Sequence, residues 1–250
     1  MNDSAAALAL TELGARVRSL RTHDVTPLLG PDTPMFFPNP APIIRPFARH
    51  QTEGVAANTW EFHEHSGAHV DAPFHFDPEG KTTDELPADV LFLRPFKKFD
   101  LSGYDLAPGV PASLQHVEAV AELDGLTLNE GDIAIVDFGY DKYLPGMPDE
   151  RPAGWWGLNQ PGLSEEACEY FAAAKVIAVG SDTSACDLGM ADGKVTAGTG
   201  HTKHFLPRGI LIVEGLCGLG SVPASGLFVA LPLKLAGSTA SPLRVLLLTD

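Results

Sequence analysis

His65-Ser66-Gly67-Ala68-His69-Val70-Asp71-Ala72-Pro73-Phe74-His75 carries three imidazoles and one carboxylate within eleven positions. Imidazole nitrogen and carboxylate oxygen form a ligand set that suits Zn²⁺ or Mn²⁺. A single histidine beside an apolar stretch is usually a hydrogen-bonded structural residue, but four candidate side chains in one short segment favour a metal site. We therefore predict that His65, His69 and Asp71 bind a metal ion and that His75 acts as an acid/base group.

The spacing of these residues also constrains the backbone. In a straight strand His65 and His69 would lie roughly 13 Å apart at ~3.3 Å per residue, which is too far for two ligands of one ion. A helix would bring positions four apart together but would turn Asp71 to another face, and Pro73 opposes its continuation. The sequence therefore predicts a strand that bends just after His65, because Gly67 can adopt a positive φ.

Composition limits the classes of protein to consider. The 250 residues, of which 44% are hydrophobic, suffice for one sizeable domain, and we expect residues 1–250 to form a single one. A net charge of −15 would repel phosphate backbones and anionic lipid, so neither nucleic acid nor membrane is expected as a partner. Three widely spaced cysteines, at positions 168, 186 and 217, indicate a reduced, cytoplasmic protein.

The N-terminal segment, residues 1–22, is expected to be a helix. Asp3 stands where a secretion signal would carry positive charge. Apolar residues recur at the spacing of one helical face, at Leu10, Leu13, Val17 and Leu20. This face is expected to pack on the body of the protein or on a neighbouring subunit.

Short apolar runs of the kind found in buried strands recur along the rest of the chain. The predicted strands are 58–65, 133–136, 176–179, 210–214, 227–233 and 243–248. Helices are predicted at 114–122 and 164–174, the second with Ser164 as its capping residue. Because these elements do not alternate regularly, they predict an α/β fold with a mixed central sheet.

A second polar group, at Gly200–Pro207, precedes an apolar run that ends at Glu214. A carboxylate at the end of such a strand is costly to bury unless it is paired or metal-bound. Two interpretations are open: Glu214 forms an ordinary ion pair with Lys203 or Arg208, or it lies beside the metal. We prefer the second.

The pattern His65-x3-His69-x-Asp71-x3-His75 resembles the signature of the cyclase-like metal hydrolases, a family that includes bacterial kynurenine formamidases and isatin hydrolases. The resemblance covers most of the chain. Its supporting segments are 32–34, 131–132, 161–164, 180–183 with Asp187, and 209–216. It implies the swivelling β/β/α fold of that family, assembly as a homodimer or homotetramer, and one or two Zn²⁺ or Mn²⁺ ions.

The resemblance also implies roles for individual residues. The primary ligands correspond to His65, His69 and Asp71, and the catalytic imidazole to His75. Glu214 corresponds to a ligand of a second metal position, where one is present.

A further histidine is expected shortly before Glu214. His201 and His204 are both candidates, and His201 is preferred. The segment 136–140, Val-Asp-Phe-Gly-Tyr, replaces the Arg-Thr-Gly-Trp of many relatives. This loss of an arginine and gain of an aspartate argue against a formylkynurenine-like substrate.

The predicted activity is hydrolysis of a C–N amide or imide bond, or of a lactone, in a small cyclic or aryl substrate. A divalent ion would activate water and polarise the carbonyl, while His75 would move the proton. Aromatic candidates for the substrate wall are Phe36, Phe37, Trp155 and Trp156. Two rival interpretations are a metal-dependent lyase or ring-closing cyclase, and a non-catalytic metal-stabilised binding protein with closed coordination. The presence of His75 beyond the three ligands argues against the binding protein.

Overall fold

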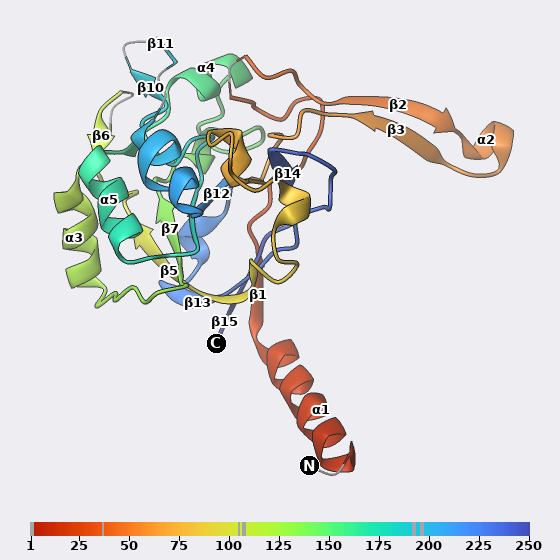
Figure 1. The fold of residues 1–250 in the computed structure, drawn as a ribbon. Coiled ribbons are helices and arrows are strands. Elements are labelled where there is room, and N and C mark those ends of the chain that lie inside the picture. The colour runs from red at the N-terminus through yellow and green to blue at the C-terminus, as the bar shows by residue number, and fades with distance from the viewer. Residues whose placement is uncertain (1–2, 37, 105, 107–108, 192–193, 196–197) are drawn as a thin grey trace.

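The computed structural model describes residues 3–36, 38–104, 106, 109–191, 194–195 and 198–250. Its centre is a nine-stranded sheet (Figure 1). In spatial order the strands are β1 (Arg21–Asp24), β15 (Leu246–Thr249), β13 (Ser225–Val229), β5 (Phe92–Asp100), β7 (Ile133–Asp137), β9 (Ala178–Ser181), β12 (Leu211–Glu214), β4 (His69–Asp71) and β14 (Ala240–Pro242). The inner strands β5, β7, β9 and β12 run parallel and the other neighbours antiparallel. The predicted α/β fold with a mixed sheet is confirmed.

Helices and small two-stranded sheets surround this sheet. The helices are α1 (Asp3–Ser19), α2 (His50–Glu53), α3 (Leu114–Leu123), α4 (Ala153–Leu158) and α5 (Glu165–Ala173). The paired short strands are β2 (Ile43–Ala48) with β3 (Ala57–Glu61), β6 (Pro111–Ala112) with β8 (Gly162–Leu163), and β10 (Met190–Ala191) with β11 (Lys194–Val195). Helices α3 and α5 lie together on one side of the sheet (Figure 1).

The side-chain alternation of the inner strands divides the core in two. In β7, Ala134 and Val136 pack beneath α3 and α5, whereas Ile133 and Ile135 pack on the opposite face. Phe171 of α5 contacts Phe99 of β5 with ring centroids 5.1 Å apart. Both faces of β7, β9 and β12 are therefore covered, which explains why these three strands are apolar at every position before their last residue.

Most of the predicted elements are present with small shifts. The predicted helices match α3 and α5, and the Ser164 hydroxyl accepts the Ala167 N–H as a cap. The predicted strands in the C-terminal half match β7, β9, β12, β13 and β15, although β15 begins only at Leu246. The prediction of a strand over 58–65 was wrong at its end, because β3 stops at Glu61 and the chain then turns toward the sheet. All five β3 residues are exposed, so their alternation marks no buried face.

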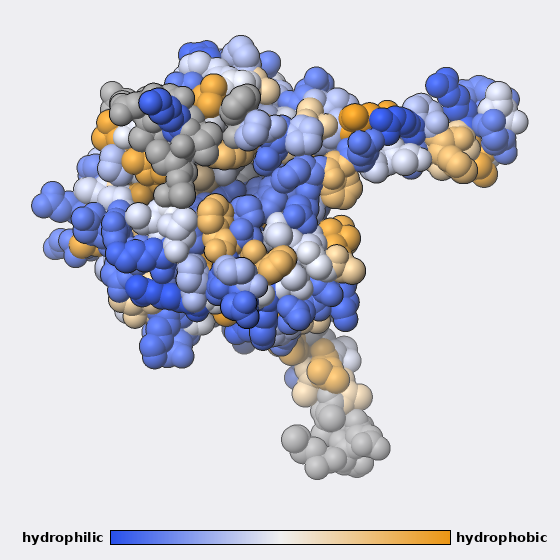
Figure 2. Space-filling model, turned by 45° about the horizontal axis from the view of Figure 1, so that its top comes forward, coloured by the Kyte–Doolittle hydropathy of each residue, from blue (hydrophilic) through white to orange (hydrophobic). Residues whose placement is uncertain are grey.

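Two elements project from the body. Strands β2 and β3, with α2 at their tip, form an arm on one side, and α1 extends on another (Figure 1). Hydrophobic residues lie along the arm and on α1 (Figure 2). On the arm they include Phe47, 79% exposed, and on α1 Leu10, 69% exposed. The predicted helix at the N-terminus is present, and of its apolar face Leu10 and Leu13 are exposed whereas Val17 and Leu20 are half-buried.

Within the described residues, no helix combines the length and the apolar character needed to cross a membrane.

Gly162 offers a test of the tight packing between β8 and the segment at Asp187. A Cβ at position 162 would lie 2.1 Å from the Asp187 carbonyl oxygen, and the Leu163 N–H donates to Cys186 O at 3.0 Å. Gly162→Ala should therefore force the two backbones apart and cost about 2 kcal/mol of unfolding free energy, which lowers Tm by about 5 °C in a thermal melt.

The matched control is Gly103→Ala, because no heavy atom lies within 4 Å of a Cβ at that position. An unchanged Tm for Gly162→Ala would show that the two segments are not held at this separation.

Candidate metal centre

The pairing of β4 with β12 brings three of the predicted ligands to one face. Glu214 lies opposite His69, and Val213 lies opposite Val70. Because side chains alternate along a strand, His69 and Asp71 point away from the core that holds Val70 and Val213. Residues more than 140 positions apart in the sequence thereby meet on one face of the sheet.

His65 reaches the same point through the predicted bend. Gly67 has φ +61°, and a Cβ at Gly215 would lie 2.7 Å from the Gly67 carbonyl oxygen. This close approach turns the chain back, so that His65 Nδ1 lies 2.7 Å from Asp71 Oδ1. The prediction that the segment bends at Gly67 is confirmed.

The downstream histidine at the centre is His201. Its Nε2 lies 3.2 Å from Glu214 Oε1 and 3.4 Å from Asp71 Oδ2. His204, in the same helical turn, points away and pairs with Glu169 at 2.7 Å from its Nδ1. The spacing in the sequence left His201 and His204 as alternatives. In the structure the His201 side of this turn faces the sheet, so His201 is the histidine that reaches the centre.

The ion-pair interpretation of Glu214 was wrong. Lys203 pairs with Glu165, and Arg208 pairs with Glu169. Glu214 is only 3% exposed and lies among imidazoles instead, with Oε2 3.3 Å from His69 Nε2.

These five side chains have the donor set and the geometry for a divalent ion. Two groups, one of His65, His69 and Asp71 and one of Asp71, His201 and Glu214, each place their ligand atoms within 4.8 Å of one another. Although the contacts are short, several buried atoms make no hydrogen bond to any described residue. These atoms are His69 Nε2, both Asp71 carboxylate oxygens and Glu214 Oε1. Buried carboxylates left without a donor require a cation.

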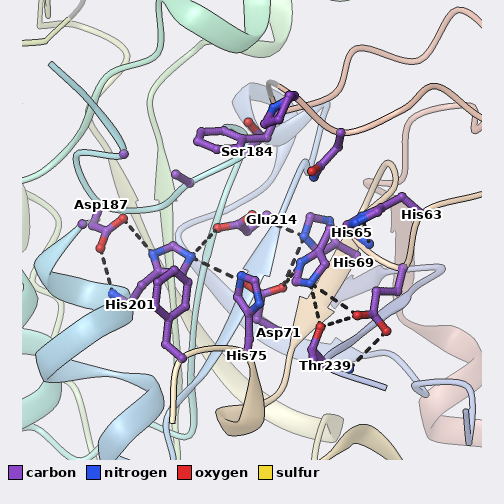
Figure 3. Close-up of a pocket in the computed structure, with 18 residues that line it drawn as sticks. His63, His65, His69, Asp71, His75, Ser184, Asp187, His201, Glu214 and Thr239 are labelled. Atoms are coloured by element: carbon purple, nitrogen blue, oxygen red, sulfur yellow. Dashed lines mark hydrogen bonds and ion pairs between the residues drawn. The ribbon is translucent and has the colours of Figure 1, made fainter. Parts of the chain in front are cut away.

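Hydrogen bonds around the centre orient each imidazole (Figure 3). His69 Nδ1 donates to Gly67 O at 2.8 Å, which leaves Nε2 as the free lone pair. His201 Nδ1 donates to Asp187 Oδ1 at 2.9 Å, and the His201 backbone N–H donates to Asp187 Oδ2 at 2.8 Å. Each imidazole therefore turns its other nitrogen toward the centre, as metal-binding histidines do.

His65 is oriented through two further residues. Its Nε2 donates to Thr239 Oγ1 at 3.0 Å, and the Thr239 hydroxyl donates to the Glu64 carboxylate. The Thr239 backbone N–H donates to the same carboxylate at 3.1 Å. This chain of hydrogen bonds holds His65 Nδ1 toward Asp71.

The residues that orient the imidazoles were not identified from the sequence as a group. Asp187 occurred only within a supporting segment of the family resemblance, and Glu64 and Thr239 carried no signal of their own. Asp187 fits against His201 because Gly198 and Gly200 flank it, where a Cβ would lie 2.2 Å and 2.7 Å from its carboxylate. These glycines follow Asp187 by more than ten positions, so the contact left no signal in the sequence.

The electrostatics of the centre favour positive charge. Burial alone would lower the pKa of His69, but the carboxylates of Asp71 and Glu214 outweigh it and raise this pKa to about 10. The pKa of His201 is raised well above its usual value, since the effect of burial is exceeded by Asp187 and the other carboxylates. Without an ion the centre therefore binds protons in its place.

His75 stands beside the centre without joining either group. It belongs to the 3-10 turn Pro73–His75, and its ring centroid lies 4.1 Å from that of His65 and 6.3 Å from that of His201. Burial and the neighbouring imidazoles lower its pKa to about 4, although Asp71 acts in the opposite direction. His75 is therefore neutral near pH 7.

A cavity of about 570 Å³ opens onto the centre. Phe36 and Phe76 line it together with the five candidate ligands and His75. His63 also lines it, and His63 Nδ1 accepts the His65 backbone N–H at 3.2 Å.

The predicted aromatic wall is only partly assembled at this cavity. Phe37 lies outside the described residues. Trp156 lines an adjoining cavity. Trp155 lines neither of these two cavities and packs on Tyr143, with ring centroids 5.1 Å apart, because α4 turns it toward the loop after β7.

The fold and the centre define a metal-dependent hydrolase. Residues 23–188 match the family model described as "Putative cyclase", which covers more than half of the chain, so the chain belongs to the cyclase family.

Similar proteins agree with this assignment. An isatin hydrolase of Roseibium aggregatum is 30% identical over 258 residues, which cover 96% of this chain and 97% of that protein. A kynurenine formamidase of Salinibacter ruber is 31% identical over 186 residues, which cover 73% of this chain and 75% of that protein. The crystal structure of an isatin hydrolase bound to the product analogue thioisatinate superposes with a TM-score of 0.83 at 26% identity, over 98% of this chain and 99% of that one.

The raised pKa of His69 predicts how the stability of the metal-free protein depends on pH. A pKa of about 10 lies above the ordinary 6.5, so the stabilisation from protonated His69 is complete below pH 6.5 and is lost as pH rises through 10. In EDTA, Tm should fall by several degrees between pH 6.5 and 9.5. Added Zn²⁺ or Mn²⁺ should remove this fall, because the ion replaces the proton.

His69→Gln serves as the control, since it cannot be protonated, and its Tm should depend less on pH. A metal-free wild-type protein whose Tm is level over this range would contradict the electrostatic account of the centre.

Proposed function

We propose that the protein hydrolyses a C–N amide or imide bond, or a lactone, of a small cyclic or aryl substrate. The observation that carries this proposal is the set of unpaired buried atoms on His69, Asp71 and Glu214, converging beside a free imidazole in an open cavity. The isatin hydrolase and kynurenine formamidase similarities support the same bond types.

The five convergent side chains would hold the metal, with His65, His69 and Asp71 as one group and His201 and Glu214 completing a second. Asp71 belongs to both groups, so its carboxylate would be shared if two ions bind. Imidazole and carboxylate ligands suit Zn²⁺ or Mn²⁺. When bound, the ion supplies an activated water and polarises the scissile carbonyl.

The protein side chains supply proton transfer and positioning. His75 is neutral, has no hydrogen bond to another described side chain, and lines the cavity beside His65. It would accept the proton of the attacking water and return it to the leaving nitrogen or oxygen. Asp187, Thr239 and Glu64 would keep the imidazoles in the orientation that this geometry requires.

The open cavity argues against a binding protein with closed coordination, because about 570 Å³ beside the centre leaves room for a substrate. A lyase or ring-closing cyclase would use the same residues without consuming water. Product analysis in isotopically labelled water separates it from a hydrolase, since only hydrolysis places a solvent oxygen in the product.

His75→Gln tests the assignment of the acid/base group. The variant should retain near-stoichiometric metal by elemental analysis, because position 75 lies outside both ligand groups. Its kcat should fall by about 10²- to 10⁴-fold, because the group that moves the proton is lost. Turnover is measured on isatin, N-formylkynurenine, cyclic imides and lactones, before and after chelation. His65→Ala should lose metal and activity together.

The control is His50→Ala at the exposed tip of the arm, which should change neither quantity. Retention of both metal and activity by His65→Ala would refute the site, and full turnover by His75→Gln would assign the proton transfer to another group.

We also propose that the protein is a homodimer or homotetramer of the cytoplasm. The exposed apolar residues of the arm and of α1 support an assembly of identical subunits. Three free cysteines, two of them buried, are consistent with a reducing compartment.

Phe47→Glu tests this assembly, because it places a charge on the most exposed apolar side chain of the arm. Light scattering after size exclusion should show a smaller assembly than the wild type. Leu123→Glu on α3, 83% exposed in the wild type, is the matched control and should leave the mass unchanged. A wild-type monomer would contradict the proposal.

A further inference from the structure

A second cavity adjoins the candidate metal centre. It measures about 490 Å³ and shares four residues with the cavity that holds the ligands. The shared residues are Phe36, His65, His69 and Ser184. Ser184 lies across the pocket from His75 (Figure 3). The imidazoles of His65 and His69 therefore stand where the two cavities meet, and a group bound at the centre has space on both sides.

The two cavities differ in chemistry. The first contains the candidate ligands, His75 and the carboxylates of Glu64 and Asp187. The second is walled mainly by apolar side chains from four segments of the chain. Its apolar members include Leu28, Met35, Leu144, Met147, Trp156 and Leu216. Leu28 and Met147, 92% and 41% exposed, lie at its rim.

Neither cavity offers a basic side chain other than histidine. Among the described residues that line them there is no lysine or arginine, while Asp32, Glu64 and Asp187 contribute acidic groups. The nearby cations are engaged elsewhere: Lys142 and Arg151 lie over the ring of Tyr143, 5.0 Å and 5.5 Å from its centroid. A carboxylate on the substrate would therefore lose its hydration without gaining a counter-charge.

The loop that forms the outer wall of the second cavity is fixed to the sheet. Asp182, at the end of β9, accepts the backbone N–H groups of Phe138 and Tyr140 at 2.9 Å and 2.5 Å. Asp141 Oδ2 accepts the Gly218 N–H at 2.6 Å. Leu144 and Met147 follow directly along this loop and line the cavity. The apolar wall is thus preformed rather than a mobile surface, as a specific binding site requires.

We propose that the substrate is an uncharged molecule with an apolar body, whose scissile carbonyl lies at His65 and His69 and whose apolar body fills the second cavity. This inference rests on the proposed function, because it assumes that the carbonyl reacts at the centre. It assigns Met147, Leu144 and Leu28 as residues that select an apolar group and reject a carboxylate-bearing one.

The test measures binding to the metal-loaded protein by calorimetry, so it does not depend on turnover. Hydroxamates serve as probes because they chelate a bound metal through one end and carry a chosen tail at the other. The series runs from acetohydroxamate to octanohydroxamate, with suberic acid monohydroxamate as the tail of equal length that ends in a carboxylate. Each buried methylene contributes to affinity, so octanohydroxamate should bind at least about tenfold more tightly than acetohydroxamate. Octanohydroxamate should also bind more tightly than the suberate probe, by a similar factor.

Met147→Arg should invert the second preference, because it adds a counter-charge at the rim. Affinity for the suberate probe should rise and that for octanohydroxamate should fall, each by several-fold. Leu123→Arg adds the same charge on α3, away from both cavities, and should change neither value. Leu28→Arg, at a more exposed rim position, provides a second variant should Met147→Arg fail to fold in a thermal melt.

Several outcomes would overturn the inference. They are equal affinity for the two long probes, tighter binding of the suberate probe by the wild type, no gain with tail length, or no binding of any hydroxamate. An effect of Leu123→Arg equal to that of the rim variants would do so as well. Failure of the proposed function is seen separately: hydroxamates bind with the stated preference, but no amide, imide or lactone with an apolar tail is turned over.

Discussion

Two buried carboxylates without hydrogen-bond donors constrain this structure more than any other feature. Asp71 and Glu214 are almost fully buried, and their free oxygens face the imidazoles of His65, His69 and His201. Such charges are stable only beside a cation, whether this is a metal ion or the protons that the raised pKa of His69 describes. The bend at Gly67, the close approach of Gly215 and the glycines around Asp187 all serve to bring these groups together.

The sheet explains why the centre lies where it does. Strands β5, β7, β9 and β12 run parallel and end at one edge, where Asp137, Asp182 and Glu214 follow their apolar runs. Ligand sites in open α/β sheets occur at this carboxyl edge. Here the short antiparallel strand β4 pairs with β12 and adds His69 and Asp71 to it. Metal chemistry and the anchoring of the loop after β7 therefore depend on the same edge of the sheet.

The candidate metal centre and the apolar wall of the second cavity are built from different sets of residues. The candidate ligands and His75 come from a short segment and from residues that face it. The walls of the second cavity are the proposed determinants of the substrate, and they come from the loop before the arm, the loop after β7, α4 and the segment after β12. In this chain β7 ends in Asp137, which pairs with Lys98 at 3.4 Å and does not line either cavity.

The sequence alone determined the short-range features. It predicted the bend at Gly67, the inner strands β7, β9 and β12, the helices α3 and α5, and the segment that carries the candidate ligands, because each is encoded in local spacing and periodicity. It did not predict β5, whose Arg94, Lys97 and Lys98 interrupt the apolar pattern. It could not choose between His201 and His204 or between two partners for Glu214, and it took the alternation in 58–65 for one longer strand. Only the tertiary structure answers those questions. The pairing of strands depends on residues more than a hundred positions away, and so does the side of a helical turn that faces the sheet. For the same reason the roles of Asp187, Thr239 and Glu64, and the apolar second cavity, emerge only when separate segments meet.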